Sequence, residues 1–145
     1  MPESTSIQHC DSSLYVLAHS ASGSHLARHL INDGSYILRH LRAVAFTDSN
    51  HSIKWLKNHG KVSSFVQSSS SLYVRTANEY DCEKRVPGEL CKADQFWKHR
   101  FGDIHTIWAG TNDHSLSNWT AHSFIWEHFD KYLGCNETYV RMPQD

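Results

Sequence analysis

The 145-residue sequence has no excess of basic residues, no long apolar run and no signal-peptide pattern. Because 14 Lys and Arg face 15 Asp and Glu, it lacks the bulk positive charge that neutralises nucleic-acid phosphates. No apolar run approaches the roughly 20 residues that cross a bilayer, and the polar segment 1–13 lacks a basic stretch followed by an apolar one. These absences argue against a membrane protein and indicate the cytosol or the nucleus.

Cysteine is sparse and scattered. Cys10, Cys82, Cys91 and Cys135 form no CxxC pair, which favours free thiols in a reducing compartment. A Cys82–Cys91 disulfide is the alternative for a secreted chain. The sequence has no internal repeat and no low-complexity domain. Its length and its 39% of apolar residues predict one domain with a packed core.

Continuous apolar runs, typical of strands buried on both faces, follow the polar leader. They predict strands at 14–18, 43–47, 62–66 and 104–109. Segments whose apolar residues recur at helical spacing lie between these strands and after the last one. The alternation predicts an α/β protein with a mainly parallel sheet of about four strands.

The expected helices differ in length. One begins after Gly23 and ends at residues 32–34, where Asn-Asp-Gly favours a turn. A terminal amphipathic helix is expected over 119–132, with short helices near 53–57 and 93–98. Five aromatic side chains are expected to point into the core: Trp55, Trp108, Trp119, Trp126 and Phe129. Residues 134–145 are expected to form a polar tail.

The first strand leads through a sharp turn into the first helix. A serine on such a turn is the geometry of a nucleophile elbow, which needs small residues two places before and after the serine. Here the sequence is Ala18-His-Ser20-Ala-Ser22, so both flanking residues are small although neither is glycine. Ser20 is therefore the candidate nucleophile, and the backbone N–H of Ala21 is the candidate oxyanion donor.

A serine hydroxyl needs a base, and the base needs an acid that orients it. Asp48 follows the next strand, and His114 lies in the loop after the last strand. The carboxyl ends of parallel strands share one edge of a sheet, so Ser20, Asp48 and His114 are expected to converge there. This constellation predicts a serine hydrolase acting on an ester or an amide.

Each of these residues also has a simpler interpretation. Ser20 is a candidate cap of the following helix, Asp48 a candidate helix cap or Asx-turn residue, and His114 a candidate solvated loop residue. Asp113 and His51 are the rival acid and base. His25 and His29 lie one helical turn apart, which is half of a metal site, but spacing supplies no further ligand. No metal or cofactor is therefore predicted.

Three blocks carry a resemblance to a known family. They are VLAHSA at 16–21, RAVAFTDSNH at 42–51 and AGTNDHSLSNW at 109–119. Together they resemble the domain family named after the second argonaute-binding protein (the Arb-two family), which also occurs in animal cotranscriptional regulators. The resemblance covers residues 14–133. Ser22 stands where the family tends to have glycine.

The resemblance implies part of an α/β-hydrolase-like, three-layer fold that lacks its N-terminal strands. It also implies a nuclear interaction module that works with an argonaute-type protein in heterochromatin or cotranscriptional gene regulation. The near-neutral charge balance predicts that any contact with small interfering RNA is indirect, through that protein. The missing strands would leave the first strand as an open edge, able to pair with another chain. The altered elbow and the absent front half predict weak catalysis or none.

Overall fold

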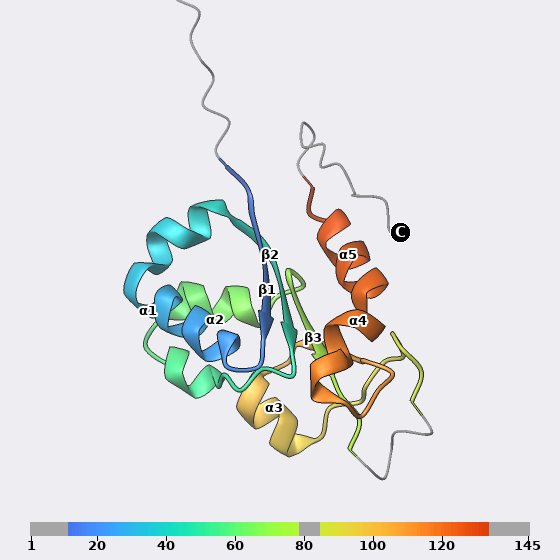
Figure 1. Ribbon diagram of the computed structural model, residues 1–145. Coiled ribbons are helices and arrows are strands. Elements are labelled where there is room, and N and C mark those ends of the chain that lie inside the picture. The colour runs from blue at the N-terminus through green and yellow to red at the C-terminus, as the bar shows by residue number, and fades with distance from the viewer. Residues whose placement is uncertain (1–11, 79–84, 134–145) are drawn as a thin grey trace, which may run out of the picture.

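The computed structural model describes residues 12–78 and 85–133, which form an α/β domain (Figure 1). The expected leader, apart from residues 12 and 13, the tail at 134–145 and three of the four cysteines lie outside the described residues. Cys91 is buried as a free thiol, with its pKa raised by burial. None of the described helices is long and apolar enough to cross a membrane.

Four parallel strands form one sheet in the order β1-β2-β3-β4. Their bounds are Leu14–His19, Leu41–Thr47, Ser71–Arg75 and His105–Trp108. Within the described ranges there are five α-helices: α1 Ser22–His40, α2 Gly60–Val66, α3 Gln95–Phe101, α4 Ser117–Thr120 and α5 His122–Asp130. Two 3-10 helices, η1 Ile53–Leu56 and η3 His114–Leu116, follow β2 and β4. The predicted α/β class and a parallel sheet of four strands are confirmed, with one of the four strands at a different position from the predicted one.

The helices form layers on both faces of the sheet (Figure 1). Val44 and Phe46 of β2 point to the side of α1, α2 and α3, whereas Ala43 and Ala45 point to the side of α5. This alternation follows from the period of two along a strand. Because both faces are covered, β2 is a nearly continuous apolar run, which is why its sequence predicts it well.

The strand predicted at 62–66 is wrong. These residues belong to α2, and the third strand is β3 at 71–75. Val62 and Val66 lie four residues apart and are both buried, which is one face of a helix. The short apolar run fits either structure, and the β-branched valines favoured the wrong one.

The first helix does not end at residues 32–34. It bends at Asp33, whose φ of −131° and ψ of 28° are not helical, and then continues to His40. The turn-forming residues therefore kink the helix rather than end it. The predicted terminal helix is likewise divided, at Ala121, into α4 and α5.

Three tryptophans predicted to be buried are exposed instead. Trp55, Trp119 and Trp126 expose 48%, 71% and 41% of their surface, whereas Trp108 and Phe129 are buried as expected. The predicted inward position of Trp55 is therefore wrong. Its neighbour Leu56 is completely buried and fills the inward position of η1.

β1 is an edge strand of the described sheet. Leu14 and Leu17 on this strand expose more than two fifths of their surface. A hollow of about 440 Å³ lies beside the strand, between Tyr15, Leu17 and α5 residues that include Trp126. The expected pairing of this edge with another chain stays a prediction.

Candidate active site at the carboxyl edge of the sheet

The chain leaves β1 and β2 through two residues with left-handed backbone. Ser20 has a φ of 54° and Asp48 a φ of 43°, and these are the two non-glycine residues with positive φ in the described ranges. Such backbone is uncommon outside glycine, and it persists where the surrounding structure holds it. Both candidate residues are thus set on sharp turns at one edge of the sheet.

The turn at Ser20 is held by the loop that follows β2. The Ser20 N–H donates to the Thr47 carbonyl at 3.0 Å, and the Ser20 carbonyl accepts from Asn50 N–H at 3.3 Å and Gly23 N–H at 3.2 Å. Asp48 N–H in turn donates to the Val74 carbonyl at 3.0 Å. The loops therefore extend the register of the sheet beyond its strands.

Asp48 and His114 are joined, although 66 residues separate them. His114 Nδ1 lies 2.8 Å from Asp48 Oδ2. The Asp48 carboxylate also accepts hydrogen bonds from the Thr76 hydroxyl and, at 2.8 Å, from the Thr76 N–H. The aspartate side chain is 14% exposed and the histidine 52%, so the carboxylate is fixed while the imidazole faces solvent.

This contact determines the tautomer of a neutral His114. An ionised carboxylate only accepts hydrogen bonds, so Nδ1 carries the proton and Nε2 keeps its lone pair. That is the arrangement of a general base oriented by an acid. Within the described residues, no hydrogen bond joins the Ser20 hydroxyl to His114. Instead the His19 ring lies against the His114 ring, with their centroids 4.5 Å apart.

The structure also bears on the simpler interpretations. The Ser20 side chain makes no cap for α1, whose N-cap is Ala21, and η1 is capped by Ser52 rather than by Asp48. Asp113 caps the turn that begins η3, where it accepts hydrogen bonds from Ser115. The Ala21 N–H makes no hydrogen bond to any described residue, so this predicted oxyanion donor is available.

His51, the rival base, is buried behind this edge. It is 1% exposed, and its Nδ1 lies 2.6 Å from Ser49 Oγ. Its ring is stacked on Phe46, with centroids 4.1 Å apart, and its Nε2 is buried without a partner among the described residues. Burial, assisted by the nearby Arg100 charge, lowers the His51 pKa to about 4. His51 therefore supports the Ser49 loop and does not reach the solvent-facing edge.

Tyr73 supports the same loop. Its hydroxyl donates to the Ser49 carbonyl at 2.7 Å, and burial raises its pKa far above the ordinary value. The phenol is thus neutral and acts as a hydrogen-bond donor that holds the turn after β2.

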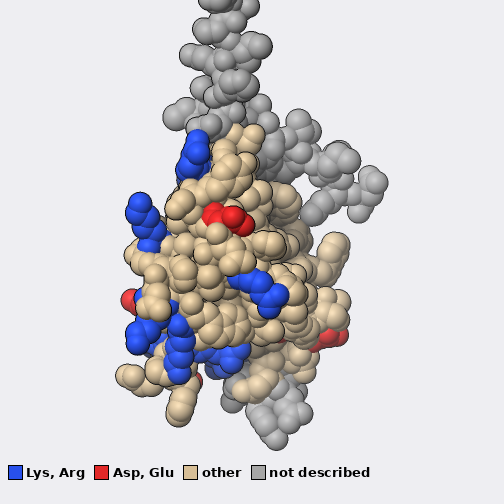
Figure 2. Space-filling model, turned by 90° about the vertical axis from the view of Figure 1, so that its left-hand side faces the viewer, with Lys and Arg blue, Asp and Glu red and all other residues tan. Residues whose placement is uncertain are grey.

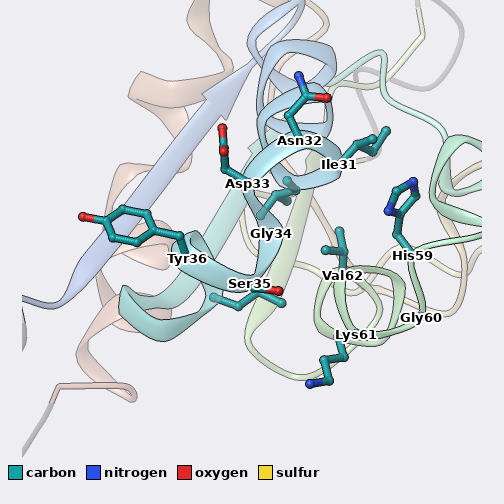
Figure 3. Close-up of a pocket in the computed structure, with 12 residues that line it drawn as sticks. Ile31, Asn32, Asp33, Gly34, Ser35, Tyr36, His59, Gly60, Lys61 and Val62 are labelled. Carbon is teal, nitrogen blue, oxygen red and sulfur yellow. The ribbon is translucent and has the colours of Figure 1, made fainter.

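A separate cavity of about 500 Å³ lies between the kink of α1 and the start of α2. Figure 3 shows Ile31, Gly34 and Val62 close together there, with His59 beside them, whereas the Tyr36 ring points away from α2. The kink lies 11 residues after Ser22, the first residue of α1, which is roughly 16 Å along a helix, so this cavity is not part of the edge that holds Ser20. The described ranges contain no group of three metal-ligating side chains.

Two features of the site escaped the sequence analysis. Thr76 is absent from the predicted site because it follows β3, which the sequence predicts nine residues too early, so its position at the carboxyl edge is not recognisable. His19 was visible beside Ser20, but its contact with His114 depends on how two distant loops pack. Side chains alternate along β1, which places His19 on the side of the sheet that faces α5. This alternation could predict the contact between His19 and His114 once the position of His114 is known.

No protein-family model, curated protein or solved structure matches this chain.

Proposed function

We propose that this chain is a domain of the Arb-two type on an α/β-hydrolase-like scaffold, and that it serves as a nuclear interaction module. The partner is an argonaute-type protein in small-RNA-linked regulation of heterochromatin or transcription. The proposal rests first on the resemblance of the three sequence blocks. Its support from the structure is that the three sequence blocks lie together at one edge of the sheet. Ser20 follows β1, Asp48 follows β2, and His114 begins η3 after β4.

The observation that carries an interaction role is the exposure of apolar residues in the third block. Leu116 and Trp119 expose 45% and 71% of their surface beside His114, and the Trp119 ring stacks on His122. Exposed tryptophan in a defined position is typical of the anchor residues of protein interfaces. This part of the edge therefore suits a protein partner.

A double variant, Leu116→Ser with Trp119→Ser, is expected to abolish co-precipitation of argonaute from nuclear extract, because it removes the two exposed apolar anchors. The matched control is Tyr36→Ser, which removes an aromatic ring that is 66% exposed on α1. The control is expected to retain the partner. Equal recovery of argonaute with both variants would reject this surface.

A second candidate function is that of a serine hydrolase, favoured by the contact between Asp48 and His114. In this reaction the Ser20 hydroxyl attacks an acyl carbonyl while His114 Nε2 takes its proton, and Asp48 stabilises the imidazolium that forms. The oxyanion is held by the Ala21 N–H, and protonation of the leaving group by His114 completes acyl transfer to Ser20. The reaction requires the Ser20 hydroxyl to come within hydrogen-bond distance of His114 Nε2, and catalytic hydrogen bonds often tighten only when substrate is bound.

A fluorophosphonate probe tests the second candidate. The wild-type chain is expected to be labelled, and Ser20→Ala to remain unlabelled because the attacking oxygen is gone. Ser22→Ala, two residues away on the same turn, is the matched control and is expected to be labelled normally. If wild type is not labelled while argonaute binding persists in Ser20→Ala, the hydrolase function is wrong and the interaction module stands.

A further inference from the structure

The basic residues of this chain are segregated, although its net charge is −1. Between residues 22 and 75 there are only two acidic residues, Asp33 and Asp48, and Asp48 is engaged with His114 and Thr76. The same segment holds seven basic residues: Arg28, Arg39, Arg42, Lys54, Lys57, Lys61 and Arg75. Figure 2 shows the side of α1 and α2, where blue Lys and Arg side chains gather toward the lower edge and red ones are few.

At one end of this side, η1 and α3 pack against each other. Arg100 of α3 anchors the contact, because its guanidinium donates to the Asn50 carbonyl at 2.7 Å and to the His51 carbonyl at 3.3 Å. We define the η1–α3 surface by six exposed residues on these two elements and the turn after η1: Lys54, Trp55, Lys57, Phe96, Lys98 and Arg100.

Two aromatic rings of the η1–α3 surface face solvent. Phe96 exposes 87% and Trp55 48% of its surface, and along the chain each lies within two residues of an exposed lysine. Exposed rings interleaved with basic side chains are the arrangement by which proteins stack unpaired bases while holding the phosphates between them.

A hollow of about 380 Å³ opens on this surface between Phe96, Trp97 and Arg100. The Arg75 guanidinium lies 4.2 Å from the centroid of the Trp97 ring, so the hollow has a cationic wall stacked on an aromatic one. Its one carboxylate, Asp94, accepts a hydrogen bond from the Trp97 N–H as the cap of α3. The lining suits a planar group that bears a negative charge, such as a nucleotide.

We propose that the η1–α3 surface binds single-stranded nucleic acid directly, in contrast to the indirect contact that the net charge of the whole chain predicts. Its lysines hold phosphates, its two exposed rings stack bases, and the hollow beside Arg75 receives one nucleotide. An acidic peptide would satisfy the charges but leave the ring faces unused, and a duplex hides its bases from stacking. This site is separate from the edge that holds Ser20 and does not depend on the function proposed for that edge.

The test is fluorescence anisotropy of the full chain with a labelled 12-nucleotide single strand, as RNA and as DNA. Binding is expected to weaken steeply with added salt, as phosphate contacts require. The double variant Lys54→Glu with Lys98→Glu is expected to weaken binding by at least about 10-fold, and Phe96→Ala by about 10-fold through lost stacking. All three residues are exposed, and circular dichroism verifies that the variants are folded.

The matched control is Lys131→Glu, which reverses an exposed charge after α5 on the other side of the sheet. It is expected to leave the affinity unchanged. The proposal is overturned if the single strands fail to bind at low salt, or if Lys131→Glu weakens binding as much as the double variant. It is also overturned if polyglutamate competes as well as RNA and Phe96→Ala has no effect, because the surface would then bind acidic protein.

Discussion

An alanine at Gly23 is expected to lower the free energy of unfolding by about 3 kcal/mol and the melting temperature by roughly 10 °C. A Cβ atom at this position would lie 1.6 Å from Ser49 Oγ and 2.8 Å from Ser49 Cβ. Rotating the serine hydroxyl relieves the first overlap but not the second, because a Cβ atom moves only with its backbone. The first turn of α1 must therefore move away from the loop after β2.

That displacement breaks more than one contact. Ser49 is buried, and its hydroxyl is the hydrogen-bond partner of His51 Nδ1. Turning it away leaves the imidazole with no polar partner among the described residues, since Nε2 already has none. An unsatisfied buried polar group costs about 1–3 kcal/mol, which adds to the steric loss. The Gly23 N–H also closes the turn at Ser20, so the elbow is disturbed with it.

The matched control is Gly60→Ala. A Cβ at Gly60, the first residue of α2, meets no described atom within 4 Å. The free energy of unfolding is expected to stay the same or rise by a few tenths of a kcal/mol, because alanine restricts the unfolded chain. Chemical denaturation of both variants measures the difference.

A double-mutant cycle identifies the cause of the loss. In a Ser49→Gly background both atoms that the new methyl group meets are absent, so Gly23→Ala is expected to cost less than about 1 kcal/mol there. The same loss in both backgrounds would show that helix packing elsewhere, not the contact with Ser49, requires glycine at this position.

The sequence predicts Ser20 and Asp48 at one edge because the composition changes sharply where β1 and β2 end, although β1 is an edge strand and only β2 is buried along its length. β1 and β2 are apolar runs that stop abruptly at polar residues, so their ends are readable. His114 was found in the same way from β4. The position of Thr76 is lost with β3, because the three apolar residues of this short strand are no more numerous than those of the helix before it. The order of the elements can therefore be predicted from composition. The partners of a side chain depend in addition on how the strands align with one another.

Exposure of the aromatic residues was the least predictable feature. Trp119 and Trp126 are expected in the core as large apolar residues, but α5 buries the face of Ile125 and Phe129, and Trp126 lies outside that face. Trp119 lies in the separate helix α4, before the break at Ala121. His51 shows the converse. Its polar side chain indicates a surface position, yet the Ser49 hydroxyl two residues earlier satisfies Nδ1 and lets the ring pack on Phe46. These outcomes follow from packing between elements, which the order of residues along one element does not specify.

Acidification is expected to destabilise the protein through His51. The pKa of this residue is about 4 in the folded chain and 6.5 in the unfolded one, because burial disfavours the charged ring. Between these values the unfolded state binds more protons, so the free energy of unfolding falls as the pH falls from about 6.5 toward 4. A difference of about 2.5 pKa units corresponds to roughly 3 kcal/mol across this range.

Urea denaturation at a series of pH values measures this loss in wild type and in His51→Phe. Phenylalanine keeps a ring against Phe46 but does not titrate, so the stability of the variant is expected to fall less between pH 6.5 and 4. The carboxylates and the buried His128, whose pKa burial also lowers, contribute to both proteins and cancel in the difference. His25→Ala, at an exposed position on α1, is expected to follow the wild-type curve. Parallel curves for wild type and His51→Phe would contradict the assignment of this pH dependence to His51, because the dependence would then arise from other groups. In that case His51 would still support the Ser49 loop at acid pH.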